Sequence, residues 1–223
     1  MNEPWAAVFG RQRRQMVAEQ LRHRGICSGR VLDAMLAIPR HEFVPSSCLA
    51  DAYSDQALPL GMGQTISQPL IVAAMSAALE PAGTGRVLEV GTGSGYHAAV
   101  LSRLADEGFT VEYREELAAA AAERLARLGC RNVCVLLGDG GLGWPAAAPF
   151  DAIVVTAAAL AVPPPLLDQL AEGGRLVIPL GGADSQELFQ HRKRNGRIER
   201  RSLDHCRFVP VVGIHGWGRP LRG

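Results

Sequence analysis

The sequence predicts an α/β fold in which a mostly parallel, doubly wound sheet has an antiparallel edge and is preceded by N-terminal helices. Short, continuous apolar strands alternate with helices from residue 86 to about residue 179. A glycine-rich turn follows the first of these strands. Further along, two strand-like runs flank Asn195 and Gly196, a dipeptide typical of two-residue hairpin turns.

The N-terminal third is expected to be helical with one irregular stretch. Residues 11–36 carry apolar side chains at helical spacing, and Gly25 divides them into two short helices. A proline-bounded connector is expected at residues 38–45. Residues 52–68 lack periodicity and are rich in Gly, Pro and Gln, which in a compact domain favours a functional segment. An apolar helix is expected at residues 69–79.

Strands and helices alternate regularly after this helix. The expected strands are residues 86–90, 110–113, 132–136, 151–155 and 175–179. The expected helices are residues 96–105, 115–128 and 165–170, and residues 187–212 should form the antiparallel hairpin. We expect one domain over residues 1–223, with a helical cap and a substrate and cofactor loop in residues 1–82 and a Rossmann-like core in residues 83–223.

Composition excludes several classes of protein. The formal net charge is +1, which argues against a protein that gains affinity by neutralising many phosphates of a nucleic acid. We find no apolar run of roughly 20 residues and no secretory signal, so no membrane partner is expected. Five cysteines without zinc-ligand spacing predict a reduced, cytoplasmic protein. The histidines are not spaced as metal ligands either, so no metal is expected, and we expect a monomer.

A nucleotide site is predicted where the first strand meets its helix. Gly91, Gly93 and Gly95 form a G-x-G-x-G turn that lets the backbone approach a cofactor closely. Glu112, 21 residues after Gly91, ends the next strand and can accept both hydroxyls of an adenosine ribose. Glu89 would repel a pyrophosphate but suit a cationic amino-acid moiety. The pattern therefore favours S-adenosylmethionine over a dinucleotide, unless Glu89 is a capping or ion-paired acid.

Two further loops are expected beside this pocket. Asp139, between Gly138 and Gly140, follows the third strand and could accept a hydrogen bond from the exocyclic amine of adenine. The alternative is an ordinary turn built from Asp and Gly. Thr156 begins a run of small residues after the fourth strand, which would leave room for methyl transfer.

Motifs along nearly the whole chain resemble the protein-L-isoaspartate O-methyltransferase family. The most specific is residues 63–69 (GQTISQP), whereas the glycine turn is common to many methyltransferases. The resemblance implies protein-L-isoaspartate(D-aspartate) O-methyltransferase activity. Such an enzyme transfers a methyl group from S-adenosyl-L-methionine to the α-carboxylate of L-isoaspartyl residues in damaged proteins and peptides. The products are S-adenosyl-L-homocysteine and an ester that cyclises to a succinimide, from which normal aspartate is partly recovered.

The resemblance also implies roles for individual residues. Ser67 corresponds to the serine treated as catalytic in that family; a helix N-cap before Pro69 is its alternative role. Together, the resemblance, the glycine turn and the loop after the fourth strand give the expected cofactor contacts. They are Gln64, Thr65, Ile66, Ser67, Glu89, Gly91, Gly93, Gly95, Glu112, Tyr113, Asp139, Gly140 and Thr156. The chain departs from the family pattern at Gln56, Ala57, Leu70 and His97, where His, Pro, Tyr and Gln are frequent.

The chemistry fits a site without a strong general base. A carboxylate with a pKa near 4 is already ionised at neutral pH, so its methylation needs in-line positioning, which a Ser67 hydroxyl could provide. Other acceptors remain open, namely an aspartate in one dedicated peptide or a small molecule. A non-catalytic S-adenosylmethionine-binding module would be expected to have lost Glu112, a loop glycine or Ser67. The glycine spacing and Glu89 disfavour a nicotinamide oxidoreductase.

Overall fold

The computed structural model describes residues 3–79 and 85–216, with side chains from residue 5 onward. Within these residues, seven strands form one sheet in the order β5-β4-β3-β6-β7-β8-β9. Neighbours from β5 to β7 are parallel, while β8 and β9 add an antiparallel edge. The strands are β3 Arg86–Val90, β4 Glu107–Glu112, β5 Val133–Leu137, β6 Phe150–Val155, β7 Leu170–Gly181, β8 Gln186–Arg194 and β9 Arg197–Cys206.

The strand order reverses between β3 and β6. From β3 the chain proceeds outward through β4 to β5, then returns to the other side of β3 as β6 and continues outward to β7. In an open α/β sheet, the crevice beyond the carboxyl ends of the strands at such a reversal is where ligands bind. The topology therefore directs attention to the loops that follow β3, β4 and β6.

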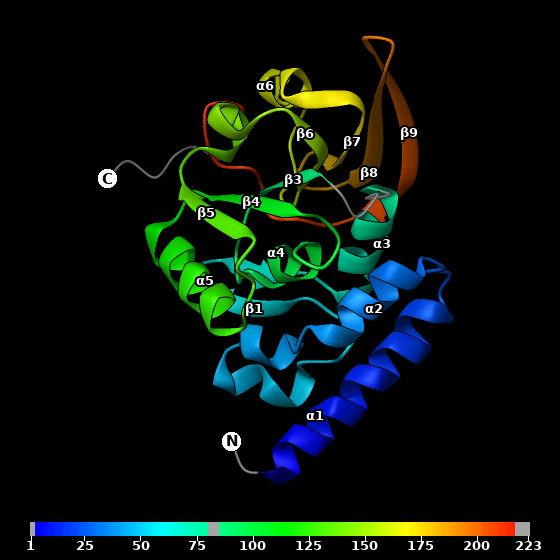
Figure 1. The fold of residues 1–223 in the computed structure, drawn as a ribbon, viewed down its shortest axis with the longest axis vertical. Coiled ribbons are helices and arrows are strands. Elements are labelled where there is room, and N and C mark those ends of the chain that lie inside the picture. The colour runs from blue at the N-terminus through cyan, green and yellow to red at the C-terminus, as the bar shows by residue number, and fades with distance from the viewer. Residues whose placement is uncertain (1–2, 80–84, 217–223) are drawn as a thin grey trace.

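Helices cover both faces of the sheet (Figure 1). The face carrying Val87, Ala152 and Val154 shares one apolar core with most of the helices, whereas Leu88, Ile153 and Val155 face a second core that includes Leu166 of α6. The helices on the first core are α1 Glu3–Gln15, the π-helix η1 Met16–Arg22, α2 Gly29–Ala37, α3 Pro69–Leu79, α4 Tyr96–Leu101 and α5 Glu115–Arg127. Helix α6, Pro164–Asp168, packs on the second core. Short 3₁₀ segments are η2 Arg40–Phe43, η3 Ser46–Asp51, η4 Gly140–Leu142 and η5 Pro145–Ala147. The N-terminal helices thus pack on the same core as the sheet.

The fold class predicted from the sequence is confirmed. The hairpin turn lies at Asn195 and Gly196, both with positive φ, 52° and 69°, as a type I′ turn requires. Several boundaries differ from expectation: β4 begins at Glu107 rather than at residue 110, α4 ends at Leu101 rather than at residue 105, and β9 ends at Cys206 rather than at residue 212. The first helix begins at Glu3 rather than at residue 11, and β7 extends beyond residues 175–179 because it pairs with β6 on one side and β8 on the other.

The segment expected to be irregular contains a hairpin. Strand β1, Leu58–Gly61, pairs antiparallel with β2, Gln64–Ile66. Met62 and Gly63 form the turn with φ values of 52° and 69°. A positive φ is unusual for Met, so the turn was not recognisable from residue types alone. The hairpin fixes the backbone immediately before Ser67.

The boundary expected between residues 82 and 83 lies outside the described residues. Over residues 3–79 and 85–216, none of the helices combines the length and the apolar character that crossing a membrane requires.

Candidate active site

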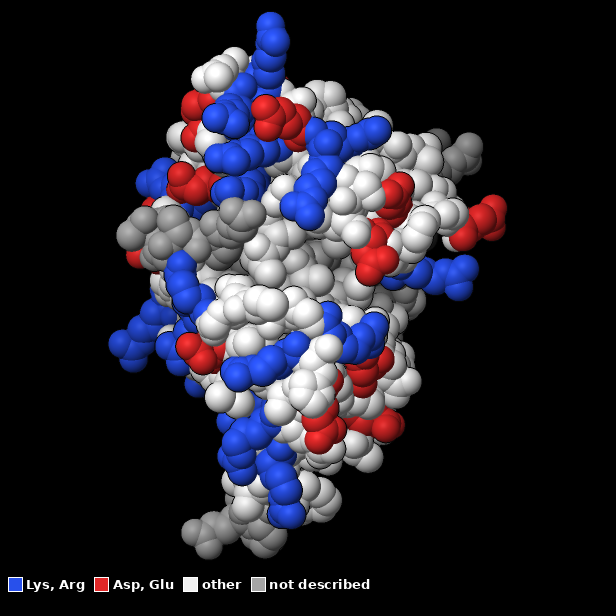
Figure 2. Space-filling view, turned by 90° about the vertical axis from the view of Figure 1, so that its right-hand side faces the viewer, with Lys and Arg blue, Asp and Glu red and all other residues white. Residues whose placement is uncertain are grey.

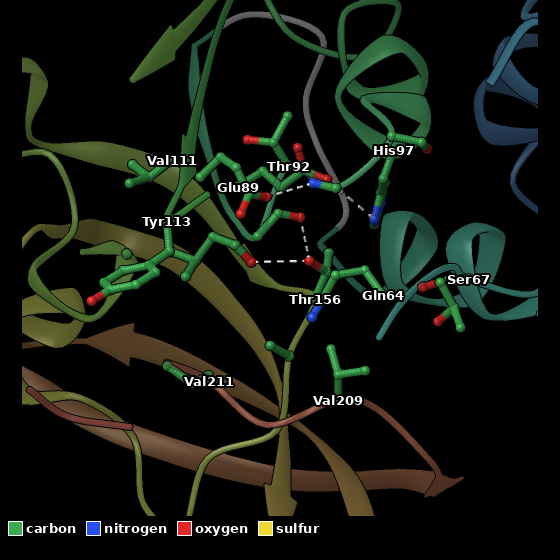
Figure 3. Close-up of a pocket in the computed structure, with 18 of the residues that line it drawn as sticks. Gln64, Ser67, Glu89, Thr92, His97, Val111, Tyr113, Thr156, Val209 and Val211 are labelled. Atoms are coloured by element: carbon green, nitrogen blue, oxygen red, sulfur yellow. Dashed lines mark hydrogen bonds and ion pairs between the residues drawn. The ribbon is translucent and has the colours of Figure 1, made fainter. Parts of the chain in front are cut away.

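A pocket lies at the carboxyl ends of β3, β4 and β6, where the strand order reverses (Figure 3). The β1–β2 hairpin, the start of α4 and the chain after β9 close its sides. Tyr113 and Ser67 lie at opposite ends of the pocket in Figure 3, with Glu89 between them. The sequence-predicted residues that line it are Gln64, Thr65, Ile66, Ser67, Glu89, Gly91, Gly93, Glu112, Tyr113, Gly140 and Thr156.

The glycine turn brings the backbone close to two neighbouring elements. Gly91, with φ of 97°, leaves no room for a side chain, because a Cβ there would lie 2.5 Å from Thr156 Oγ1. Thr156 donates its hydroxyl to the Gly91 carbonyl oxygen at 2.6 Å, which joins the loops after β3 and β6. Gly95 lies beside the pocket rather than on its lining, and a Cβ there would lie 3.3 Å from Ala121 Cβ of α5.

Glu112 organises the floor of the pocket. Its side chain is 7% exposed. Oε2 accepts the Gly93 N–H at 2.8 Å and Oε1 accepts the Arg114 N–H at 3.0 Å. One carboxylate therefore connects the glycine turn to the residue that precedes α5. Each oxygen has a second lone pair, so both remain able to accept a hydroxyl from a ligand.

Glu89 is a buried acid on β3. Its side chain is 1% exposed, and Oε2 accepts the Thr110 hydroxyl at 2.7 Å, whereas Oε1 has no hydrogen-bond partner among the described residues. Burial, assisted by the nearby Glu112 carboxylate and opposed by the Thr110 hydrogen bond, raises the pKa of Glu89 to about 8. The nearest ring nitrogen of His97, Nδ1, lies 4.0 Å from Oε1. Burial lowers the His97 pKa to about 3, so His97 is neutral and is not an ion-pair partner.

The hairpin and a second cavity meet at Ser67. Thr65, Ser67, Thr156, Val209 and Pro210 line both the pocket and an adjoining cavity of about 630 Å³. The Ser67 hydroxyl makes no hydrogen bond within the described part of the chain, so the N-cap bond considered from the sequence is not seen. Figure 2 shows a hollow of uncharged residues near the middle of this face of the molecule, with Lys and Arg side chains above and below it.

Asp139 holds the tail of the chain. Oδ2 accepts the Ile214 N–H at 2.7 Å and Oδ1 accepts the Gly141 N–H at 2.9 Å. Asp139 therefore stabilises the turn, as the alternative considered from the sequence has it, and lies beside the pocket lining, which Gly140 reaches. Its contact with adenine stays a prediction, because each carboxylate oxygen has a second lone pair. A Cβ at Gly213 would lie 2.1 Å from Oδ1, so the tail passes very close to the carboxylate.

We expect Asp139→Ala to release this tail. Loss of a hydrogen bond to a charged acceptor costs about 1.5–3 kcal/mol, so the Ile214 amide should exchange with deuterium about 10 to 100 times faster. Hydrogen–deuterium exchange of Asp139→Ala, with the exposed acid variant Asp184→Ala as control, measures this. Unchanged exchange together with weakened cofactor binding would instead favour the adenine contact expected from the sequence.

Sequence reasoning missed several lining residues. The tail supplies four of them, Val209 to Val212, and Thr92, His97 and Arg114 supply polar groups. The tail has no chemical signature, and its position depends on bridges from Ala158 N–H to the Val209 carbonyl and from Val211 N–H to the Ala158 carbonyl, each 2.8 Å. Over the described residues, no group of three or more His, Cys, Asp or Glu side chains could hold a metal ion.

Comparisons with known proteins agree with one another. The family model for protein-L-isoaspartate(D-aspartate) O-methyltransferase matches residues 11–216. A protein-L-isoaspartate O-methyltransferase of Roseiflexus castenholzii is 54% identical over 209 residues, covering 94% of this chain and 95% of its own. One of Koribacter versatilis is 52% identical, covering 94% of both chains.

Solved structures give the same picture. A protein-L-isoaspartate O-methyltransferase superposes with a TM-score of 0.84 at 32% identity, covering 92% of this chain and 67% of its own. A Plasmodium falciparum protein, described as a protein-L-isoaspartate O-methyltransferase in complex with S-adenosyl-L-homocysteine, has a TM-score of 0.76 at 26% identity. It covers 89% of this chain and 97% of its own.

Proposed function

This chain belongs to the protein-L-isoaspartate(D-aspartate) O-methyltransferase family, and from this premise we propose how its residues methylate the α-carboxylate of L-isoaspartyl residues with S-adenosylmethionine. The observation that carries the proposal is the position of Ser67 on the shared wall of two cavities. One cavity has the groups that a charged nucleoside needs. The other is an adjoining space that is large enough for a peptide side chain.

The pocket residues fit the cofactor. When bound, S-adenosylmethionine supplies an activated methyl group on its sulfonium. The buried Glu89 Oε1, which lacks a partner, suits the ammonium of the amino-acid moiety, because a buried acceptor without a hydrogen bond is unfavourable. Glu112 would accept the ribose hydroxyls at the remaining lone pairs of its two oxygens. Tyr113, 39% exposed at the end of the pocket away from Ser67, would pack against the adenine.

The adjoining cavity supplies the acceptor side. Its lining combines apolar side chains, such as Ile71 and Phe208, with polar and charged ones, such as Gln68 and Arg207. The Ser67 hydroxyl in this lining has no hydrogen bond within the described chain. Ser67 would donate that hydroxyl to one oxygen of the isoaspartyl carboxylate and leave the second oxygen directed at the methyl group. Correct positioning of two reactants can by itself account for several kcal/mol of the barrier.

No base is required of the protein. The acceptor carboxylate is ionised at neutral pH, and transfer of a methyl cation to it releases no proton. His97, the histidine of the cofactor pocket, is 6% exposed and its Nε2 lies 2.9 Å from Ser76 Oγ, and His205 lines the adjoining cavity; the reaction needs neither of them as a base. The site would therefore work by orienting the acceptor oxygen toward the methyl group.

The test is methyl transfer to two peptides that differ only in carrying isoaspartate or aspartate at one position. We expect base-labile methylation of the isoaspartyl peptide alone. Ser67→Ala should lower kcat/KM about 10- to 100-fold, because one hydrogen bond to a charged group is lost, with cofactor affinity nearly unchanged. Ser47→Ala, an exposed serine that contacts Cys48, is the matched control.

The other acceptors give different outcomes. Cofactor binding without methylation of either peptide would contradict the repair function and favour a methyltransferase dedicated to one peptide substrate. Equal methylation of both peptides would contradict the proposed selectivity.

We also propose the substrates, the oligomeric state and the compartment of this enzyme. Its partners are isoaspartyl proteins and peptides, and the enzyme acts as a monomer in the cytoplasm. The free state of all five cysteines, Cys27, Cys48, Cys130, Cys134 and Cys206, supports a reducing compartment.

A further inference from the structure

His97 links the cofactor pocket to a buried serine on a neighbouring helix. The ring lies at the start of α4, and its Nε2 is 2.9 Å from the hydroxyl of Ser76 on α3. Its Nδ1 is 4.0 Å from Glu89 Oε1, and Figure 3 shows the ring directed toward that carboxyl group. The three side chains are at most 6% exposed. Both ring nitrogens therefore have a defined neighbour.

The two oxygens of Glu89 are not equivalent. Oε2 accepts the hydroxyl of Thr110, the residue beside Glu89 in the register of β4, and the Thr110 and Thr92 hydroxyls lie 2.6 Å apart. Oε1 is left to the pocket and to His97. A ligand that enters here meets one carboxyl oxygen and one imidazole nitrogen on the same side of the pocket.

We propose that His97 is protonated on Nε2, where it donates to Ser76 Oγ, so that His97 Nδ1 and Glu89 Oε1 together accept the cofactor ammonium, and that Glu89 releases a proton to solvent when the ammonium binds. This inference rests on the proposed cofactor site. His97 is then a cofactor-positioning residue for which the family pattern has Gln, another side chain that combines a donor and an acceptor.

Hydrogen-bond complementarity selects this tautomer. A neutral imidazole has one donor and one acceptor nitrogen. With the proton on Nε2, the ring donates to Ser76 Oγ and presents a lone pair at Nδ1. In the free enzyme that lone pair faces Glu89 Oε1 at 4.0 Å, and in the complex it can accept from an ammonium that lies between the two. The other tautomer would direct an N–H at the cation, where donor faces donor.

The charges around Glu89 explain why a proton is held before the cofactor arrives. Thr92 faces it from the glycine turn, Thr110 and Glu112 from β4, and His97 from α4, and its neighbour on β6 is the apolar Val154. The titratable or charged side chains of the described lining are Glu89, Tyr96, His97, Glu112, Tyr113 and Arg114. Glu112 disfavours a second carboxylate, and burial raises the pKa of Glu89 to about 8. The ammonium of the bound cofactor places a positive charge beside Glu89, which stabilises the carboxylate, so Glu89 loses its proton.

Calorimetry of S-adenosylhomocysteine binding tests the proton release. This ligand carries the same ammonium and avoids turnover. Binding heats at pH 7 in two buffers with different ionisation enthalpies give the number of protons released. We expect release of most of one proton, since burial raises the pKa of Glu89 to about 8 and the group is then mostly protonated at pH 7. Between pH 6 and 7.5 the dissociation constant should fall about tenfold per pH unit. In Glu89→Gln, proton release should disappear.

Variants of His97 test how much this residue contributes to cofactor affinity. His97→Leu removes the second acceptor and should weaken binding about 10- to 100-fold, while His97→Gln should restore binding to within about threefold. His191→Gln changes another buried histidine, on β8 and outside the pocket lining, and should leave both affinity and proton release unchanged. Nitrogen NMR of the free enzyme should show the Nε2-protonated form of His97 in the wild type.

Several results would overturn the inference. They are an Nδ1-protonated His97, full affinity in His97→Leu, or binding without proton release. Each of these leaves the proposed methyltransferase function intact. Absence of any S-adenosylhomocysteine binding to the wild type would instead remove the proposed function and this inference with it.

Discussion

Replacing Glu112 with alanine should weaken S-adenosylhomocysteine binding at least about 100-fold. The carboxylate holds the Gly93 N–H at 2.8 Å and the Arg114 N–H at 3.0 Å, and hydrogen bonds to a charged group contribute about 1.5–3 kcal/mol each. The variant loses the anchors of the glycine turn as well as the proposed acceptors for the ribose. Isothermal calorimetry measures the dissociation constant directly.

Glu107→Ala is the matched control for this change. Glu107 begins the strand that Glu112 ends, and its exposed ion pair with Arg86 lies at the opposite end of β4. Exposed pairs contribute about 0–1 kcal/mol, so Glu107→Ala should bind the cofactor product normally. Normal binding by Glu112→Ala would contradict the assignment of the ribose site.

Replacing Phe150 with alanine should have the opposite profile, a large loss of stability with little effect on binding. Phe150 is fully buried at the start of β6 and packs edge-to-face with Phe109 at a centroid distance of 5.6 Å. Removal of a buried Phe side chain costs about 3–5 kcal/mol. For a chain of this length, the melting temperature should fall by roughly 6–20 °C.

Two comparisons identify the cause of that loss. Phe150→Leu should cost much less, because most of the buried volume is kept. Leu160→Ala, at a side chain that is 67% exposed, should melt near the wild-type temperature. Below the transition, Phe150→Ala should bind S-adenosylhomocysteine normally, since the site lies at the other end of β6. Weak binding by the folded variant would show that the apolar core around Phe150 also shapes the pocket.

Much of the fold follows from local sequence. Continuous apolar runs such as that of β6 can bury both faces of a strand only in a sheet covered by helices, and Asn195-Gly196 can form its turn wherever the flanking strands pair. The position of Glu112 at the end of its strand follows from the same alternation. These features depend on neighbours in the chain, so residue types and spacing predict them.

The site required more than local sequence. Met62 adopts a positive φ because the β1–β2 hairpin holds it there, and the sequence alone indicated only an irregular segment. For Asp139 the sequence predicts a contact with adenine, which stays a prediction, but it does not predict that both oxygens accept backbone N–H groups, those of residues 141 and 214. The second of these partners is 75 residues away, a distance that no local pattern spans.

By itself, the sequence determined the α/β fold, the glycine turn, the acids Glu89 and Glu112, and the family-specific segment that ends near Ser67. Only the tertiary structure decided that Glu89 is buried with one oxygen lacking a partner among the described residues, that His97 of α4 faces this oxygen and contacts Ser76 of α3, and that the tail closes the pocket. The physical reason is that burial and electrostatic environment depend on contacts between distant segments. Motifs fix which chemical groups are present, whereas packing fixes their protonation and their partners.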